Sequence, residues 1–131
     1  MRPALSVVRM PRVSPLKMLH IEEALLRYDA QKRNFLVLNH PRPEHKSVVL
    51  GISGKPLELC YVENTTEDSI PLVKRFTGGG TVFVDDNIAF ASFIMNKTTL
   101  PNVPPYPQDI MKWTERIYRY VFVQRALTTK L

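Results

Sequence analysis

The stretch that decides the fold reads Lys74-Arg-Phe-Thr-Gly-Gly-Gly-Thr-Val-Phe-Val-Asp85. β-prone residues at 70–76 and 81–85 predict two strands, separated by Thr77 and three consecutive glycines. Glycine loses more backbone entropy on folding than any other residue, so the triplet must serve a purpose. It is typical of positive φ angles and of close ligand approach to exposed N–H groups that bind an anion. The alternative is a simple bulge or hairpin turn.

Charged residues flank the glycines Gly78, Gly79 and Gly80. The guanidinium of Arg75 can hold a carboxylate or phosphate with two parallel hydrogen bonds, while the loop amides hold another oxygen. This combination suits an acyl phosphate. Asp85, at the end of the second strand, is expected near a ribose, a metal ion or an arginine that it positions.

The established phosphate and metal motifs are absent from the sequence. Gly80 is followed by Thr81, so there is no P-loop, and glycines 51 and 54 are too sparse for a dinucleotide fingerprint. The histidines have no ligand spacing for zinc, and no Ser-His-Asp signature occurs. We therefore predict no metal site.

Upstream of the loop, Ser14 and Pro15 read as the cap and first residue of a helix over about 15–30. Two short apolar runs, 34–39 and 47–52, predict strands joined by a polar turn. The pattern at 57–66 is mixed and favours a helix only weakly.

Downstream, 89–95 predicts a further strand, and a proline-rich link leads to a helix from about Gln108 with an apolar face. The strands together imply a sheet of at least five. We expect an α+β fold in which a mixed or antiparallel sheet is flanked by helices.

Composition bounds the function only broadly. The chain has 131 residues, enough for one modest domain, and no apolar run long enough to span a bilayer. A net charge of +6 attracts phosphates of any kind without choosing among nucleic acid, lipid and nucleotide. The basic segment 1–13 reads equally as a disordered N-terminus or as a mitochondrial transit peptide, which predicts a mitochondrial or cytoplasmic protein.

At residues 75–85 the sequence resembles the R-x-[ST]-G-G-G-[AT]-V-x-x-D signature of the lipoate-protein ligase A family, within the biotin and lipoate ligase superfamily. Ile21-Glu-Glu-Ala-Leu-Leu-Arg27 is similar to the first family helix, and Val48-Val-Leu-Gly51 to a V-V-I-G strand end. Asn87 and the strand after it match as well. The resemblance runs from about Leu19 to Phe122 and is nearest to the uncharacterised eukaryotic branch.

The resemblance implies a two-step reaction. A lipoate or octanoate carboxylate attacks the α-phosphate of ATP, with Mg²⁺ as cofactor, and the acyl group then moves from AMP to a lysine of a lipoyl domain. The acceptors would be lipoyl domains of 2-oxoacid dehydrogenase complexes or the glycine cleavage H protein. Neither nucleic acid nor membrane is an expected partner. The residues that would bind the acyl adenylate are Arg75, Thr77, Gly78, Gly79, Gly80, Gly51, Asp85 and Asn87, and the candidates for the tunnel wall are Val48, Leu50, Val82 and Phe83.

The sequence departs from the family pattern at two places. Val84 stands where many bacterial members have histidine, and no lysine after the glycines lies in the K-x-x-G-x-A context that contacts the reacting groups. We therefore expect a partial catalytic domain at 14–122, truncated at its C-terminus, with a divergent tail at 123–131. The resemblance implies a ligase or acyltransferase, whereas the missing lysine motif implies a catalytically incompetent or regulatory fragment, and the sequence leaves both alternatives open. A basic nucleic-acid-binding module is suggested by charge alone.

Overall fold

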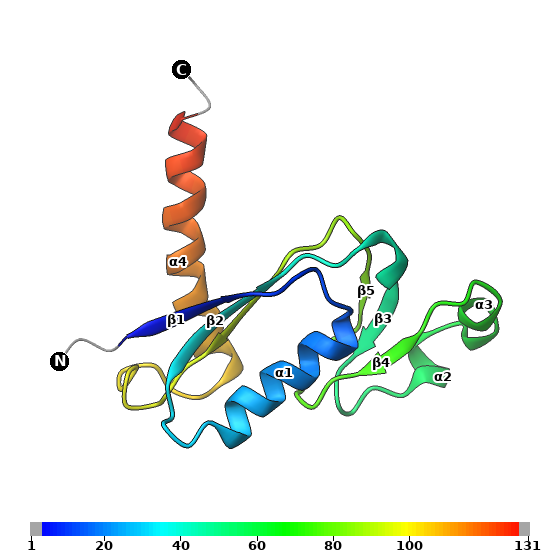
Figure 1. Cartoon of the computed structure of the whole chain (residues 1–131), viewed down its shortest axis with the longest axis horizontal. Coiled ribbons are helices and arrows are strands. Elements are labelled where there is room, and N and C mark those ends of the chain that lie inside the picture. The colour runs from blue at the N-terminus through cyan, green and yellow to red at the C-terminus, as the bar shows by residue number, and fades with distance from the viewer. Residues whose placement is uncertain (1–3, 129–131) are drawn as a thin grey trace. The chain divides into compact units, whose positions relative to one another are not determined.

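The computed structural model describes residues 4–128, which divide into two compact units. The first unit extends to Asn96 and holds six strands and the helices α1 (Pro15–Tyr28), α2 (Pro56–Leu59) and α3 (Val62–Glu67), with a 3₁₀ turn at Pro43–His45. The second begins at Lys97 and holds the long helix α4 (Pro107–Thr128) (Figure 1). The predicted α+β class is confirmed.

The predicted helices are present. Ser14 caps α1, because its side-chain oxygen accepts a hydrogen bond from the backbone N–H of Lys17 at 3.3 Å, and Pro15 occupies the first turn. The mixed stretch at 57–66 forms the two short helices α2 and α3. Helix α4 begins one residue before the predicted start. In the described part of the chain no helix is long and apolar enough to cross a membrane.

The strands lie where the sequence predicts, with one addition. The five predicted strands are β2 (Asn34–Asn39), β3 (Ser47–Leu50), β4 (Leu72–Lys74), β5 (Val82–Val84) and β6 (Phe90–Ile94). The sixth strand, β1 (Leu5–Arg9), pairs in parallel with β2. It lies within the segment 1–13, for which a disordered N-terminus was one of the two predictions. That reading is wrong for residues 5–9.

The prediction of one sheet with at least five strands is wrong. The strands form two sheets of three, in the orders β1-β2-β6 and β4-β3-β5. The antiparallel ladder between β2 and β6 ends at the pair Asn39 and Phe90, and the ladder between β3 and β5 resumes at the pair Ser47 and Val84. Between these pairs residues 40–46, which include two prolines without N–H donors, stand opposite only residues 85–89. The unequal lengths interrupt the ladder.

The core lies between α1 and one face of the second sheet. Leu19 of α1 packs with Val49, Val73 and Val84, one buried residue from each strand, and Ile88 and Phe90 pack against this cluster. Because side chains alternate along a strand, the neighbours of these residues face the other side. The face covered by α1 therefore differs from the face that carries Val48 and Phe83, which are paired across β3 and β5.

Candidate functional site

The glycine loop crosses the end of β3. Strands β4 and β5 lie on opposite sides of β3, so the chain between them passes over its C-terminal end. The backbone N–H of Ile52 donates to the carbonyl of Thr77 at 2.9 Å, and the N–H of Arg75 donates to the carbonyl of Leu50 at 2.9 Å. Since β4 and β5 do not pair with each other, the hairpin-turn alternative is wrong.

At two positions, 51 and 79, the backbone geometry requires glycine. A Cβ atom on Gly51, the residue after β3, would overlap the carbonyl oxygen of Gly79, so only glycine permits the crossing. Gly79 itself has φ of +115°, a region that residues with a side chain rarely adopt. By contrast, a Cβ atom on Gly78 or Gly80 would meet nothing within 4 Å. The fold therefore explains Gly51 and Gly79 and leaves the other two unexplained.

The backbone donors of the loop are available to a ligand. Residues 78–80 are exposed, and no acceptor within residues 4–128 takes a hydrogen bond from the N–H of Gly78, Gly79 or Gly80. Successive free N–H groups in a turn form a site for an anion. This geometry fits the anion site that the sequence predicts here.

Arg75 is held against this loop. One of its terminal nitrogens, Nη2, donates to the carbonyl oxygen of Gly80 at 2.8 Å, and the guanidinium fills the space that a side chain on Gly79 would need. Its Nε is buried and finds no acceptor in the described chain. The guanidinium is thus fixed in position, while its other terminal nitrogen, Nη1, has no hydrogen-bond partner in the described chain and remains as a donor for a phosphate.

Glu22 was not predicted as a site residue. It lies on α1 one turn after the buried Met18 and Leu19, and its carboxylate accepts a hydrogen bond from the hydroxyl of Ser92 on β6. Burial raises the pKa of Glu22, and the Ser92 hydrogen bond and the charge of Arg75 offset part of this rise. An acid on the buried side of an amphipathic helix was the sequence signal for it.

Asp85 and Asn87 bind each other rather than the loop. The carboxylate of Asp85 accepts hydrogen bonds from the backbone N–H of Asn87 at 2.9 Å and from its side-chain amide at 3.2 Å. No hydrogen bond or ion pair joins Asp85 to an arginine within residues 4–128. In the same residues no three histidine, cysteine, aspartate or glutamate side chains are grouped to hold a metal. The pair forms the turn between β5 and β6.

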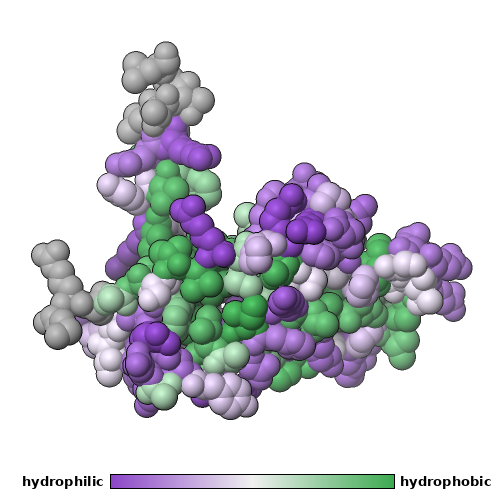
Figure 2. Space-filling model, viewed as in Figure 1, coloured by the Kyte–Doolittle hydropathy of each residue, from purple (hydrophilic) through white to green (hydrophobic). Residues whose placement is uncertain are grey.

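The four tunnel candidates lie on different faces of the sheet. Arg75 follows Val73 by two residues and belongs to the α1 face, as does Val82, which is paired with the core residue Val49. By the same alternation Val48, Leu50 and Phe83 belong to the other face. There a groove is lined by Val48, Leu59, Cys60, Tyr61, Asn64, Thr65, Asp68, Thr81 and Phe83. Leu57 and Leu59 of α2 are exposed, and Figure 2 shows apolar surface over this helix.

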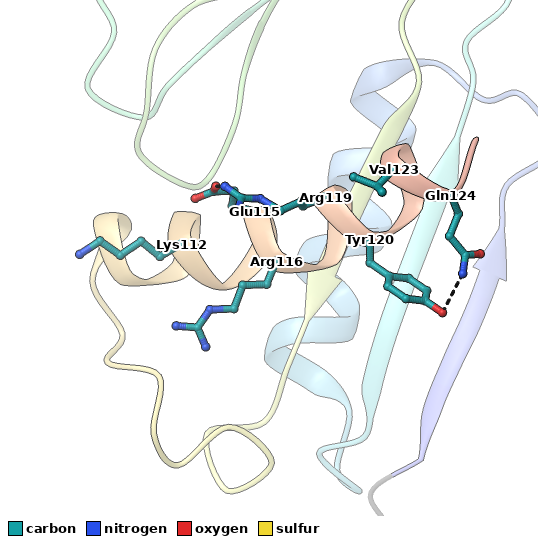
Figure 3. Close-up of a pocket in the computed structure, with 7 residues that line it drawn as sticks. All are labelled: Lys112, Glu115, Arg116, Arg119, Tyr120, Val123 and Gln124. Atoms are coloured by element: carbon teal, nitrogen blue, oxygen red, sulfur yellow. Dashed lines mark hydrogen bonds and ion pairs between the residues drawn. The ribbon is translucent and has the colours of Figure 1, made fainter. Parts of the chain in front are cut away.

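A separate concave surface lies on α4 alone. Its lining residues all belong to this helix, and none is a predicted site residue (Figure 3). Arg119 forms an ion pair with Glu115 at 2.6 Å, and the amide of Gln124 donates to the hydroxyl of Tyr120 at 3.0 Å. Tyr120 remains 67% exposed, so this is a surface of solvated side chains rather than an enclosed site.

The family follows from these residues and from a direct comparison. The model of the lipoyl protein ligase A/B catalytic domain matches residues 14–123. The chain belongs to this family. Among curated relatives, the inactive lipoate-protein ligase 2 of Plasmodium falciparum is 36% identical over 80 residues, which make up 59% of this chain and 20% of the relative. The chain thus spans about a fifth of that lipoyl ligase relative's length.

Solved structures share the lipoyl ligase fold. LipL1 of P. falciparum in complex with lipoate gives a TM-score of 0.61 at 22% identity, with 69% of this chain and 30% of that chain covered. Lipoate-protein ligase A bound with ATP gives 0.54 at 20% identity, with 71% and 36% covered. The bi-partite lipoate protein ligase of Thermoplasma acidophilum, studied with its E2 lipoyl domain, gives 0.50 at 25% identity, with 65% and 32% covered.

Proposed function

We propose that the chain binds lipoyl-AMP or octanoyl-AMP at Arg75 and the glycine loop, as the acyl-adenylate-binding part of a protein-lipoylation reaction. The observation that carries this proposal is the fixed guanidinium of Arg75 beside three glycines whose N–H groups have no acceptor in the described chain. A phosphate held by a bidentate arginine and by backbone N–H groups is both oriented and stabilised in charge.

The substrates would be lipoate or octanoate and ATP. The acyl carboxylate would attack the α-phosphate and release pyrophosphate, which leaves the mixed anhydride on the loop. Two glycines without a fold constraint, Gly78 and Gly80, support close approach of the phosphate to the backbone. Mg²⁺ usually binds substrate phosphates with only one or two carboxylates, so it would accompany ATP without a protein cluster.

The acyl chain would extend along the α1 face from Arg75. Val82 is the tunnel candidate on that face, and it is 40% exposed, so its side chain can contact a ligand. Val48, Leu50 and Phe83 belong to the opposite face and would then not line the tunnel. This assignment makes Val82 the residue of choice for testing acyl-chain length.

In the second step, the lysine amine of an acceptor would attack the acyl carbonyl and AMP would leave. We propose a lipoyl domain as the acceptor, from a 2-oxoacid dehydrogenase complex or the glycine cleavage H protein. The study of the T. acidophilum lipoate ligase together with its E2 lipoyl domain supports this class of partner.

A second candidate is binding of the acyl adenylate without transfer. The observation that favours it is the name of the P. falciparum relative, which is an inactive lipoate-protein ligase. In that case the chain would hold the adenylate, or the acyl group alone, and regulate its supply. The two candidates share the ligand and differ only in the transfer step.

Calorimetric titration with a non-hydrolysable lipoyl-AMP analogue tests the binding step. We expect Arg75→Ala to abolish binding, since it removes the charged donors. Arg42→Ala, at an exposed arginine before the opposite end of β3, is the matched control and should bind like the unchanged chain. A folded chain that does not bind the analogue would refute the proposal.

A transfer assay separates the two candidates. The chain is incubated with ATP, Mg²⁺, octanoate and a lipoyl domain, and the mass of the acceptor is measured. Acylation of the acceptor lysine over several turnovers supports the ligase function. Analogue binding that depends on Arg75, without any acylated acceptor, supports binding without transfer.

A further inference from the structure

Glu22 and Arg75 carry opposite charges where α1 packs on the sheets. Glu22 is on α1, and its carboxylate is fixed by the hydroxyl of Ser92 on β6. Arg75 lies on the sheet face that α1 covers, and its guanidinium reaches Gly80 in the loop. The two residues do not form an ion pair with each other within the described chain, so Glu22 does not cap the guanidinium, and Nη1 has no hydrogen-bond partner there.

Within residues 4–128, no cation other than Arg75 acts on the charge of Glu22. Arg75 is the charged side chain whose field acts on it. The next acid on α1, Glu23, is paired with Arg27 at 2.8 Å, and that guanidinium lies over the ring of Phe76 at 5.8 Å. The β6 contact, Ser92, is uncharged. The charge of Glu22 is therefore not neutralised by an ion pair within the described chain, and it interacts with the charge of Arg75 beside the loop.

We propose that Glu22 selects the ligand of the Arg75 loop by charge, favouring a single negative charge over two. This inference rests on the proposed function. The phosphate of an acyl adenylate, which is joined to the ribose by an ester and to the acyl group by an anhydride, carries one negative charge, whereas the phosphate of free AMP carries close to two at neutral pH. Coulomb repulsion by a fixed carboxylate is proportional to the charge of the ligand, so it disfavours AMP more than the acyl adenylate.

The arrangement separates reactant from product. After acyl transfer the ligand left on the loop is AMP, which has lost the acyl group and gained a negative charge. Glu22 then opposes retention of AMP while Arg75 and the N–H groups still attract it. The desolvated setting of Glu22 strengthens this effect, because charges interact more strongly when they are shielded from water.

Binding should also be linked to protonation. An anion on the loop offsets the positive field of Arg75, which is one of the influences that keep the pKa of Glu22 down. By reciprocity of linked equilibria, the carboxylate should take up protons when the anion binds. The uptake comes from Glu22 itself and would be absent when its side chain cannot ionise.

The test compares two ligands on three proteins at pH 8. Dissociation constants for the non-hydrolysable lipoyl-AMP analogue and for AMP are measured on the unchanged chain, Glu22→Gln and Glu23→Gln. Glutamine keeps the acceptor for Ser92 and removes the charge. For Glu22→Gln we expect binding to tighten about threefold for the analogue and about tenfold for AMP. The Coulomb energy doubles for a dianion, so the factor by which the dissociation constant changes is squared. Glu23→Gln should leave the ratio of the two constants unchanged.

Several outcomes are decisive. If Glu22→Gln leaves the ratio of the two dissociation constants unchanged, or weakens binding of both ligands, the charge-selection role is overturned. The proposed function still stands in that case if binding of the analogue depends on Arg75. Absence of analogue binding by the unchanged chain overturns both. If Glu22→Gln does not fold, proton uptake by the unchanged chain decides, measured by calorimetry of the analogue in buffers of different ionisation enthalpy. Net uptake that grows as the pH is lowered below neutrality supports the role, and none overturns it.

Discussion

The carbonyl oxygen of Gly79 occupies the place where a side chain on Gly51 would begin. This contact lets the loop between β4 and β5 cross the end of β3, and it brings Arg75 to Gly80. Both partners are backbone atoms, so neither can rotate away from an added methyl group. The position of the candidate site therefore depends on a residue 24 positions before Arg75 in the sequence.

Gly51→Ala should destabilise the fold and displace the loop. The added methyl group forces the backbone apart at the crossing, which we expect to lower the free energy of unfolding by about 1–3 kcal/mol. Urea unfolding followed by circular dichroism measures this change. Gly54→Ala is a milder comparison, because its tightest contacts exceed 3 Å. Equal stability of Gly51→Ala and the unchanged chain would contradict the crossing.

Gly78→Ala and Gly80→Ala should separate stability from binding. A methyl group at either position meets open space, so we expect the free energy of unfolding to change by no more than about 0.5–1 kcal/mol. If a phosphate approaches the backbone there, the methyl group blocks it, and affinity for the lipoyl-AMP analogue falls. Unchanged affinity in both variants would show that the phosphate binds elsewhere.

The sequence predicted the positions of the helices and strands better than it predicted which strands pair. Capping by Ser14 and the short apolar runs are local signals, and the structure confirms α1 and five strands close to the predicted bounds. Strand β1 was missed because its five residues are mostly exposed and carry no core-facing alternation. The strand order β4-β3-β5 could not be predicted from the sequence. Strands that follow each other in sequence usually pair, but β4 and β5 do not pair with each other.

In the candidate site, too, the residues of a short local motif were predicted, whereas contacts that depend on tertiary packing were not. Arg75 and the glycines were visible because their chemistry is unusual within a short stretch. Asp85 was predicted to lie near a ribose, a metal ion or an arginine. In the structure its carboxylate accepts hydrogen bonds from Asn87 two residues later, in a turn that the sequence allows without requiring. Glu22 reaches the site only through the packing of α1 on the sheets, and no local pattern specifies that packing.

Asn39→Ala should be strongly destabilising. Asn39 is buried, and its side-chain amide forms hydrogen bonds with both backbone groups of Val13. Its Oδ1 accepts from the Val13 N–H at 3.1 Å, and its Nδ2 donates to the Val13 carbonyl at 3.0 Å. Truncation leaves both buried groups of Val13 without a partner, at a cost of about 3 kcal/mol. Thermal unfolding measures the loss, with the exposed Asn102→Ala as control. Similar melting temperatures for the two variants would contradict this role.

Glu22→Gln should change how stability depends on pH. Burial raises the pKa of Glu22 above its ordinary value of 4.5, so the folded chain holds this proton more tightly than the unfolded chain. The resulting stability is fully present below the unfolded pKa and is lost as the pH rises through the folded pKa. Glutamine stays neutral and avoids the loss, so the variant should match the unchanged chain near pH 4 and exceed its stability at pH 7–8.

Urea unfolding of both proteins between pH 4 and 8 measures this difference. Asp29 has the opposite behaviour, because hydrogen bonds from Arg33 lower its pKa and its contribution is lost as the pH falls through that lowered pKa. Asp29 is the same in both proteins and cancels when one curve is subtracted from the other. A stability difference that does not vary with pH would mean that the carboxylate of Glu22 is not desolvated in the folded chain. The site would then lack the half-buried negative charge that, in the proposal above, distinguishes one phosphate ligand from another.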